Sequence, residues 1–288
     1  MAYFLMTIAY DGSNFHGWQK QPGKRTVQGD IEAALGLVLR APIAIHGVSR
    51  TDAGVHAYGQ RAGFAADTPI PAEKLRIALN NILTGRGSGS GARGDIRIRE
   101  VVLAEEGFHA RHDAVGKTYI YKMLTAGEPD IFLRNFFWQI DELPDAGVMR
   151  QAAEYLLGTH DFRSFRSAGG KGQEPTVKTI YSLRVCQGTY VTGVRDGRGE
   201  EDRNAMSGSP GVTTTVEIAG SGFLYNMVRI IVGTLAEVGA GRRGVESVPA
   251  ALAALDRRAA GPTAPPQGLY LAKVHYDRNF AVALSEGI

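Results

Sequence analysis

Residues 47–57 have the sequence Gly47-Val48-Ser49-Arg50-Thr51-Asp52-Ala53-Gly54-Val55-His56-Ala57. The apolar run 43–48 predicts a short buried strand, and the polar residues after it predict a compact turn. A cation, Arg50, and a carboxylate, Asp52, lie two residues apart in this turn. Charges near a core must be paired or they cost stability, and loops held by a rigid strand often carry catalytic groups. For a lone Arg-x-Asp, a solvated turn with an incidental ion pair is the commoner arrangement.

The composition is that of a globular protein with enough residues to bury a proper core. The chain has 288 residues, 44% of them hydrophobic and 21% charged, which suits one large domain or two ordinary ones. The net charge of +3 permits nucleic-acid binding without requiring it, because phosphate affinity depends on local clustering. A single cysteine, Cys186, excludes an internal disulfide and fits a reducing compartment.

No targeting or membrane-spanning segment is expected. The first ten residues predict a strand rather than a signal peptide. The longest apolar stretch, 227–238, is interrupted by Arg229, Gly233 and Glu237, so it does not suit a membrane span. We therefore expect a cytoplasmic protein.

The first part of the chain alternates between strand and helix patterns. Period-two alternation predicts strands over 3–10, 43–48, 59–65 and 96–102. Apolar residues at helical spacing predict a helix over 26–40 and a second one from Pro71 to about Leu83. The order β-α-β-β-α-β is that of the ferredoxin-like, or split βαβ, arrangement.

The second part repeats this theme with longer elements, so we expect domains over 1–106 and 107–288. Strands are predicted over 115–124, 133–140, 178–186, 189–195, 212–219 and 269–276, and helices over 145–157, 223–239 and 245–258. Two segments, 85–94 and 196–211, are Gly/Ser-rich or charged and have almost nothing to bury, so they are predicted to be surface loops inserted into the compact pattern.

The turn belongs to a series of motifs that resembles the tRNA pseudouridine synthase A family. The family pattern Arg-Thr-Asp-x-Gly-Val-His-Ala, then Gly-Gln, is matched by residues 50–57 with Gly59 and Gln60. Further matching motifs follow in family order over residues 3–276; they lie at 10–19, 26–28, 108–111, 117–121, 158–165, 222–229, 264–265 and 268–271. With this context, the functional interpretation of the turn is favoured.

The resemblance implies a fold and an activity. It implies an α+β protein of two ferredoxin-like (RRM-like) domains, joined through a long, mostly antiparallel sheet with helices on one face and an RNA-binding cleft between the domains. It implies a homodimer that isomerises uridine to pseudouridine at positions 38, 39 and 40 of the tRNA anticodon stem-loop. Because the reaction is an isomerisation, it calls for no redox cofactor, nucleotide or metal.

The resemblance maps the catalytic nucleophile onto Asp52. The reaction needs a group that adds covalently at C1′ of the ribose or at C6 of the base and then leaves, and an ionised carboxylate suits this role. An ordinary Asp, with a pKa of about 3.9, is ionised at neutral pH unless burial raises the value. Whether Asp52 attacks the sugar or the base is left open.

Two further catalytic residues follow from the family pattern. Arg229 is the one cation among apolar neighbours in its predicted helix; from the residues alone, a snorkelling or inter-helix arginine is equally expected. The resemblance makes it the partner that holds the Asp52 carboxylate bidentately. Tyr119 shares a strand face with Tyr121. Such tyrosines usually serve packing, but the resemblance places Tyr119 under the target uracil and leaves Tyr121 as packing.

Substrate contacts are expected from Arg50, Tyr119 and the 16–25 loop. By resemblance, Arg50 helps to hold the flipped-out base and its phosphate. The loop, which we expect to be flexible, supplies aromatic, polar and basic groups suited to RNA recognition by stacking and phosphate contact, namely His16, Trp18, Gln19, Lys20, Lys24 and Arg25.

Several histidines invite other interpretations. His56 could be a general base, but a histidine that fixes the turn by hydrogen bonds is favoured. His109 and His112, with Asp113, have metal-like residue types, but without a further ligand motif we expect no metal site.

Two alternatives to the predicted activity are kept. One is a synthase acting at another tRNA or RNA position, which gains some weight from Ser49 standing where the family usually has Gly. The other is a non-catalytic RNA-binding protein on the same scaffold; the joint presence of Asp52, Tyr119 and Arg229 argues against it, because binding alone does not need them.

Overall fold

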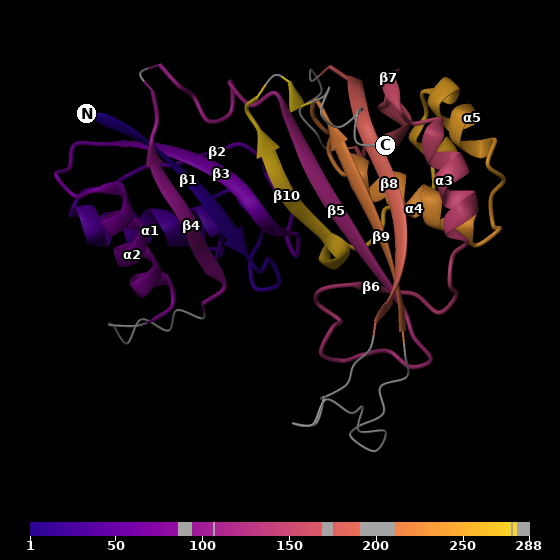
Figure 1. Ribbon diagram of the computed structural model, residues 1–288, viewed down its shortest axis with the longest axis horizontal. Coiled ribbons are helices and arrows are strands. Elements are labelled where there is room, and N and C mark those ends of the chain that lie inside the picture. The colour runs from indigo at the N-terminus through magenta and orange to yellow at the C-terminus, as the bar shows by residue number, and fades with distance from the viewer. Residues whose placement is uncertain (86–93, 106, 169–174, 191–210, 278, 281–288) are drawn as a thin grey trace. The chain divides into compact units, whose positions relative to one another are not determined.

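The structure is a computed structural model that describes residues 1–85, 94–105, 107–168, 175–190, 211–277 and 279–280. It belongs to the α+β class (Figure 1). The chain forms two compact units, of which the first contains Met1–Tyr119 and the segment from Tyr270 onward, and the second contains Ile120–Leu269. Within the described residues, no helix combines the length and apolar character that crossing a membrane requires.

The first unit has the predicted order of elements, β-α-β-β-α-β. These elements are β1 (Ala2–Tyr10), α1 (Val27–Leu39), β2 (His46–Gly47), β3 (His56–Ala66), α2 (Ala72–Leu83) and β4 (Ile96–Leu103). Strand β1 is antiparallel to both β3 and β4, and β2 is antiparallel to β3. Strand β10 (Leu269–His275) comes from the far end of the sequence and pairs parallel with β3.

The core of the first unit follows from the two periodicities of its sequence. Alternate residues of β1 are buried, among them Met6 and Ile8, and α1 buries Ile31 and Leu35 on one side. Helix α1 begins where predicted because the Thr26 hydroxyl accepts a hydrogen bond from the Gly29 N–H.

The predicted strand over 43–48 is wrong in extent, because the structure pairs only His46–Gly47 as β2. The Val48 N–H still donates to the Arg61 carbonyl, at 2.9 Å. At Ser49 the partner is instead the Gln60 side chain, so the ladder stops there. Strand β3, predicted from residue 59, begins earlier, at His56.

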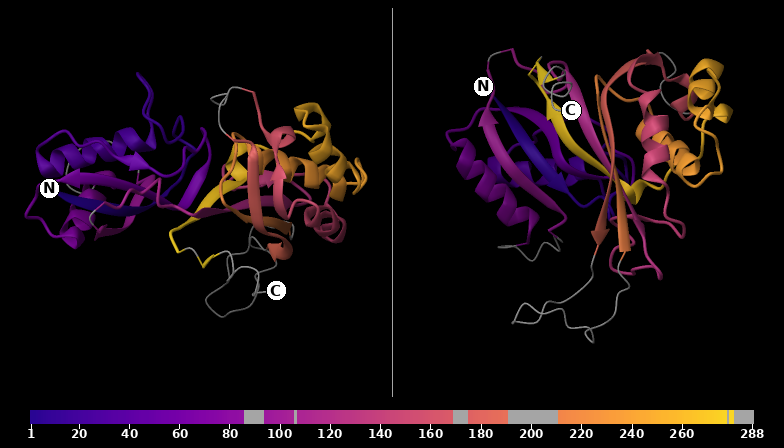
Figure 2. Two further views of the ribbon diagram at one scale, coloured as in Figure 1. Left: turned by 90° about the horizontal axis from the view of Figure 1, so that it is seen from above. Right: turned by 45° about the vertical axis from the view of Figure 1, so that its right-hand side comes forward.

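The second unit packs helices beside a sheet with the strand order β5-β9-β8-β7. Strand β5 begins in the first unit and continues into the second. The strands are β5 (Gly116–Thr125), β6 (Trp138–Gln139), β7 (Gly158–Asp161), β8 (Val177–Tyr190) and β9 (Gly211–Gly220); the helices are α3 (Ala146–Glu154), α4 (Met227–Gly239) and α5 (Ser247–Ala254), with short 3-10 helices at Arg163–Phe165, Arg257–Ala259 and Pro266–Gly268. Helix α3 contacts both α4 and β8, and Figure 2 shows the three helices gathered beside β8 and β9.

Several boundaries in the second unit differ from prediction. The predicted strands 178–186 and 189–195 are one strand, β8, as far as Tyr190, and the predicted strand 133–140 shrinks to β6. The helix predicted from 223 begins at Met227, because Asn226 before it has a left-handed backbone with φ of 60°. Strand β7 was not predicted. Apart from Gly85, Gly94 and Gly211, the predicted surface loops 85–94 and 196–211 lie outside the described residues.

Candidate active site

The loop that carries Asp52 is fixed to β3 at its start. Gln60, whose side chain is fully buried, accepts a hydrogen bond from the Ser49 N–H at 3.2 Å and donates one to the Ser49 carbonyl at 2.7 Å. The side-chain amide thereby satisfies both backbone groups of Ser49, as a neighbouring strand would. The chain leaves the sheet at this point in a defined position.

The end of β1, at Tyr10, and the segment 11–18 that follows it also hold the loop. The Trp18 N–H donates to the Thr51 carbonyl at 3.0 Å, and the hydroxyls of Tyr10 and Thr51 are hydrogen-bonded at 2.7 Å. At Gly17, whose φ is +84°, a Cβ would lie 2.6 Å from the Thr51 oxygen. Only glycine therefore permits this close approach of the two backbones.

The turn at Asp52 is short and is closed by a backbone hydrogen bond. The Val55 N–H donates to the Asp52 carbonyl at 3.2 Å, and Gly54 takes a left-handed φ of 79°. Asp52 is half-buried, whereas Arg50 is exposed. The predicted turn is confirmed, and the two predicted site residues in it differ in their access to solvent.

Tyr119, at the start of β5, lies against this loop. Its side chain is buried, and its hydroxyl donates to the Ser49 Oγ at 3.3 Å. The pKa of Tyr119 is raised to about 12, mainly by burial; the hydrogen bond with Ser49 lowers the pKa, and the negative charge of Asp52 raises it. The structure therefore brings Asp52 and Tyr119 close enough to interact, with the phenol neutral at physiological pH.

A second buried phenol belongs to the same cluster. Burial raises the pKa of Tyr10 well above its ordinary value, and the neighbouring Tyr119 adds to this effect. Hydrogen bonds with Thr51 and Gln60 act in the opposite direction. The Asp52 loop thus has the neutral hydroxyl groups of Tyr10 and Tyr119 beside it.

His56 fixes the loop by hydrogen bonding, as predicted. Its Nδ1 accepts from the Gly12 N–H at 3.0 Å and lies 3.2 Å from Asp11 Oδ1. Nδ1 can accept from Gly12 only when it carries no proton, and it can donate to Asp11 only when it carries one. The tautomer of His56 therefore decides which of the two contacts is a hydrogen bond. Burial tends to raise the pKa of Asp11, but hydrogen bonds with His56 and Ser13 outweigh it and lower the pKa to about 2.

Arg229 lies in the first turn of α4, in the second unit, and its guanidinium is held by two acceptors. Nε donates to the Ala264 carbonyl at 2.6 Å, and Nη1 donates to Asn226 Oδ1 at 2.9 Å. Asn226 is itself fixed by a 3.0 Å hydrogen bond to Ser167 Oγ. Burial raises the pKa of Tyr121, and the charge of Arg229 partly offsets this. The pairing of Arg229 with Asp52 stays a prediction.

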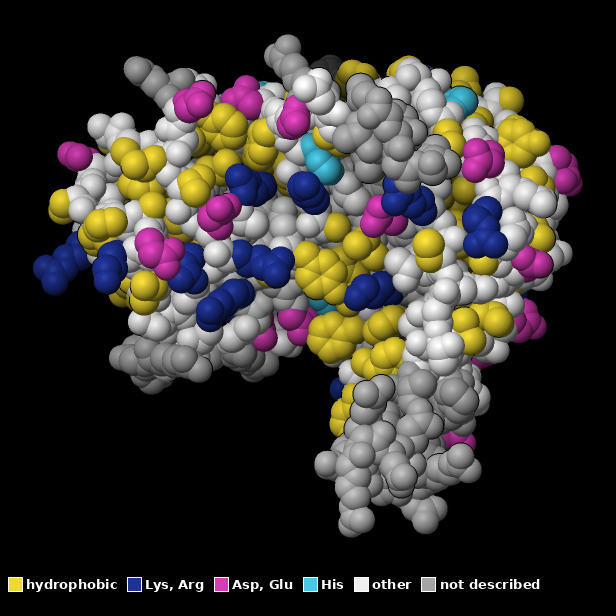
Figure 3. Space-filling view, viewed as in Figure 1, with side chains coloured by type: hydrophobic (Ala, Val, Ile, Leu, Met, Phe, Trp, Pro, Cys, Tyr) yellow, Lys and Arg dark blue, Asp and Glu magenta, His cyan; other side chains and the backbone are white. Residues whose placement is uncertain are grey.

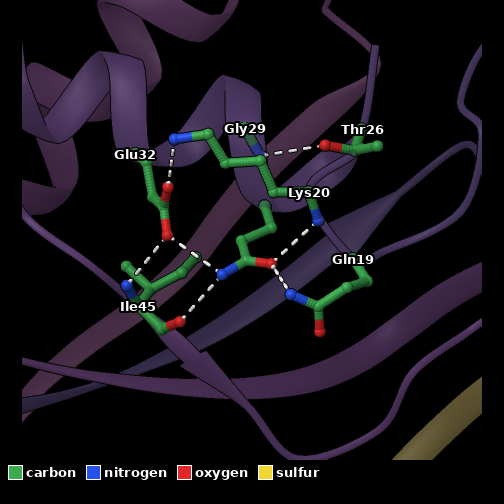
Figure 4. A network of polar contacts seen from close by, with 7 residues as sticks. Gln19, Lys20, Thr26, Gly29, Glu32 and Ile45 are labelled. Atoms are coloured by element: carbon green, nitrogen blue, oxygen red, sulfur yellow. Dashed lines mark hydrogen bonds and ion pairs between the residues drawn. The ribbon is translucent and has the colours of Figure 1, made fainter. Parts of the chain in front are cut away.

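The 16–25 loop is ordered by contacts with α1, contrary to the expected flexibility. The Gln19 side chain donates to Gln28 Oε1 at 2.7 Å, and Lys20 Nζ lies 3.0 Å from Glu32 Oε2 (Figure 4). Arg25 pairs with both Asp30 and Asp95, at 2.9 and 2.7 Å. Gln19, Lys20 and His16 are exposed, and Arg25 is half-buried.

The RNA contact expected of Trp18 does not suit its position, because the side chain is only 1% exposed. Its ring packs over Gly47, where a Cβ would lie 2.4 Å from ring atoms. The ring thus occupies the space that any larger residue at position 47 would take. In this structure Trp18 supports the Asp52 loop from within the core.

Within the described part of the chain, no group of three or more His, Cys, Asp or Glu side chains is arranged to hold a metal. His109 Nδ1 accepts from the N–H groups of Arg111 and His112, at 3.2 and 3.3 Å, and so serves the local turn.

Sequence reasoning missed the residues that position the site. Gln60 and Asn226 lie inside matched motifs and Ser49 stands where the family usually has Gly, but their roles depend on partners elsewhere in the sequence: Ser49 for Gln60, Tyr119 for Ser49 and Ser167 for Asn226. A local signal for Gln60 was its place on the same face of the predicted strand as Ala62 and Phe64, where a polar residue is unexpected. Together the site offers a carboxylate on a rigid turn beside a neutral phenol and a hydroxyl, an arrangement suited to nucleophilic and proton-transfer chemistry.

The family model described as tRNA pseudouridine synthase matches residues 6–92 and 152–277. A tRNA pseudouridine synthase A from Ruminiclostridium cellulolyticum is 41% identical over 276 residues, which cover 96% of this chain and 100% of the relative. One from Bacillus subtilis is 42% identical over 273 residues, which cover 94% and 98%.

Proposed function

This chain belongs to the tRNA pseudouridine synthase family, and from this we propose that it isomerises uridine to pseudouridine at positions 38, 39 and 40 of the tRNA anticodon stem-loop. The observation that carries the proposal is the Asp52 turn, held by Gln60 and by the segment 11–18 and set beside Tyr119. The reaction breaks the N1–C1′ bond, turns the base and joins C5 to C1′. It therefore needs no net oxidant, reductant or added group.

Asp52 acts as the nucleophile in this proposal. A carboxylate can form an ester-like bond to the substrate and leave again, and the substrate carbon is C1′ or C6. The rigid turn contributes because it holds the carboxylate in one place before the substrate arrives. Rebonding through C5 then releases Asp52 unchanged.

Tyr119 supports the uracil ring and takes part in moving the C5 proton. With a pKa of about 12 the phenol is protonated at neutral pH, so it first acts as a donor. To accept the C5 proton it must first release its own, and the balance closes at N1 of the uracil, which gains one proton in the product; Ser49 Oγ, at 3.3 Å, accepts the hydrogen bond of the Tyr119 hydroxyl and orients it. Ser49 is therefore assigned a supporting role in proton transfer.

Arg229 is proposed to pair with the Asp52 carboxylate and keep it ionised. The hydrogen bonds to Ala264 and Asn226 support this, because they fix the position of the guanidinium that would hold the carboxylate. Arg50, His16, Gln19 and Lys20 are proposed as RNA contacts. Figure 3 shows Lys and Arg side chains gathered on the visible face of the first unit, which suits contact with phosphates.

The remaining features of the proposal concern organisation. We infer two ferredoxin-like domains, 1–106 and 107–288, with the RNA bound in a cleft between them, and a homodimer in the cytoplasm. The order β4-β1-β3, with β2 on the far side of β3, supports the first ferredoxin-like domain.

The test is site-resolved mapping of pseudouridine in tRNA treated with the protein. We expect modification at 38–40 by the natural chain and none by Asp52→Asn, whose amide keeps the shape but is not a carboxylate nucleophile. Asp67→Asn, at an exposed position of the first unit, is the matched control and should retain activity. Turnover by Asp52→Asn above a small fraction of the natural rate would contradict the nucleophile assignment, and modification elsewhere would contradict the position.

A further inference from the structure

Three aromatic rings form a continuous stack directly after the Asp52 turn. His56 stacks on Tyr270 with ring centroids 4.7 Å apart and planes 19° apart. Tyr270 stacks in turn on Tyr58, at 4.9 Å and 12°. The stack joins β3 to β10, whose residues His56 and Tyr270 are register partners.

The stack changes from buried to exposed along its length. His56 and Tyr270 are 1% and 4% exposed, whereas Tyr58 is 38% exposed although Tyr270 covers one of its ring faces. An exposed aromatic ring held flat by a buried partner loses little freedom when a further ring stacks on it. Single-stranded nucleic acids are bound on such rings, because every base has an aromatic face.

A cation is placed beside the exposed ring. Arg99, on the exposed side of β4, donates from Nη1 to the Tyr58 carbonyl at 3.0 Å. Arginine has several N–H donors in a planar fork, so one can fix the side chain while others contact a phosphate. Stacking surface and phosphate donor are thus presented together.

The stack is also tied to the catalytic turn. Its inner ring, His56, contacts Asp11 and Gly12, which belong to the segment that holds the Asp52 loop. Tyr58 follows Asp52 by six residues, so at most about 20 Å of chain separates them. An RNA with its target uridine at Asp52 reaches Tyr58 within a few nucleotides.

We propose that Tyr58 and Arg99 form a nucleotide subsite in which an unpaired anticodon-loop base near the target stacks on Tyr58 and its phosphate contacts Arg99. The proposal rests on the proposed tRNA substrate. It assigns to Tyr58 a role in RNA affinity and choice of substrate rather than in the chemical step.

The experiment measures tRNA affinity and, separately, kcat and KM for pseudouridine formation. Tyr58→Ala should raise both Kd and KM by about five-fold or more, because stacking one base contributes roughly 1–3 kcal/mol, and it should leave kcat within about two-fold. Tyr58→Phe should behave like the natural chain, and Tyr58→Leu like Tyr58→Ala. Tyr155→Ala, which removes an exposed tyrosine from the end of α3, is the control and should change nothing.

The outcomes separate the subsite from the proposed function. Unchanged tRNA affinity in both Tyr58→Ala and Tyr58→Leu overturns the subsite. Equal affinity of Tyr58→Leu and Tyr58→Phe also overturns it, because an apolar side chain of similar size would then bind RNA without an aromatic ring. Loss confined to kcat overturns it too, since Tyr58 would then support the loop. If Tyr58→Ala fails to fold, the Leu and Phe pair decides. A natural chain that binds tRNA but makes no pseudouridine refutes the function, while the affinities still decide the subsite.

Arg99 is tested by the salt dependence of binding. Arg99→Gln should lower the slope of log affinity against log salt by about one, and Arg99→Lys should restore it. Arg184→Gln, at an exposed position of β8, is the control. An unchanged slope in Arg99→Gln would remove the phosphate contact from the proposal.

Discussion

The side-chain amide of Gln60 takes the place of a strand partner for Ser49. It binds both the N–H and the carbonyl of that residue, at 3.2 and 2.7 Å. Ser49 in turn accepts a hydrogen bond from Tyr119, so one buried amide positions both the start of the Asp52 turn and the hydroxyl that Tyr119 contacts. The geometry of the site thus depends on a residue that does not itself need to touch a substrate.

Replacing Gln60 by Leu should destabilise the protein and slow catalysis. Two buried backbone groups of Ser49 would lose their partners, and each unsatisfied group costs about 1–3 kcal/mol. Urea unfolding should show a lower free energy of unfolding, and kcat should fall even in the folded fraction. Gln151→Leu, at an exposed position of α3, is the control. A stable variant with normal kcat would show that the loop holds without the amide.

Gly47→Ala should destabilise the first unit, because its Cβ would lie 2.4 Å from the Trp18 ring. Overpacking of this kind costs typically about 1–3 kcal/mol, and displacement of Trp18 should also disturb the Asp52 loop and lower activity. Gly36→Ala offers a contrast within α1, where the nearest atom would be 3.7 Å away. That change should stabilise the protein by about 0.5–1 kcal/mol. Thermal melts of both variants check the pair; equal effects would argue against the packing account.

Arg229→Ala should shift the acidic limb of the pH–rate profile to higher pH. If Arg229 pairs with Asp52, its loss leaves the carboxylate without a compensating cation, which raises the Asp52 pKa, so a higher pH is needed to ionise it. Asn226→Ala should produce a smaller shift in the same direction, because it removes one of the two acceptors that hold the guanidinium. A limb that stays in place, together with weaker and less salt-dependent RNA binding, would instead identify Arg229 as a phosphate contact.

Asp11→Asn should remove a pH-dependent contribution to stability. The pKa of Asp11 is lowered to about 2 in the folded protein. The ionised carboxylate therefore stabilises the fold at pH values above the ordinary pKa of an Asp, and this stabilisation is lost as the pH falls through about 2. The shift corresponds to roughly 2.5 kcal/mol, which solvent screening of a partly exposed carboxylate reduces to about 1. Urea unfolding should therefore separate variant and natural chain at pH 7 but not near pH 2. An equal separation at both pH values would point to shape rather than charge.

Most elements could be predicted because their signals are local. Strand β1 and helix α1 follow from apolar periodicity, and the Thr26 cap marks where the helix begins. Strand β2 was predicted too long because the N–H and carbonyl of Ile45 are paired with the side chains of Glu32 and Gln28 in α1, at 3.2 and 3.1 Å, and not with β3. Strand β7 was missed because its residues, Gly158–Asp161, show no apolar alternation.

In the candidate site, too, the residues with local sequence signals could be predicted and the others could not. Asp52 and Tyr119 come together as the motifs suggested. The burial of Trp18 could not be predicted, because it depends on the space above Gly47, and that space exists only after the 11–18 segment and β2 have packed. Asn226 gave a weak signal, since asparagine is among the few residues that tolerate a left-handed backbone before a helix.

The return of β10 to the first unit bears on how the protein is made. During synthesis the ribosome releases residues 1–119 long before Tyr270, at roughly 5–20 residues per second. Until then the nascent first unit lacks the strand beside β3, and His56 lacks the ring on which it stacks. The start of the β3 edge, at His56 and Ala57, is exposed during this interval because β2 pairs only farther along, at Ala62 and Gly63, and an open strand edge invites pairing with other chains. Completion of the unit that carries Asp52 therefore waits for nearly the whole message to be translated.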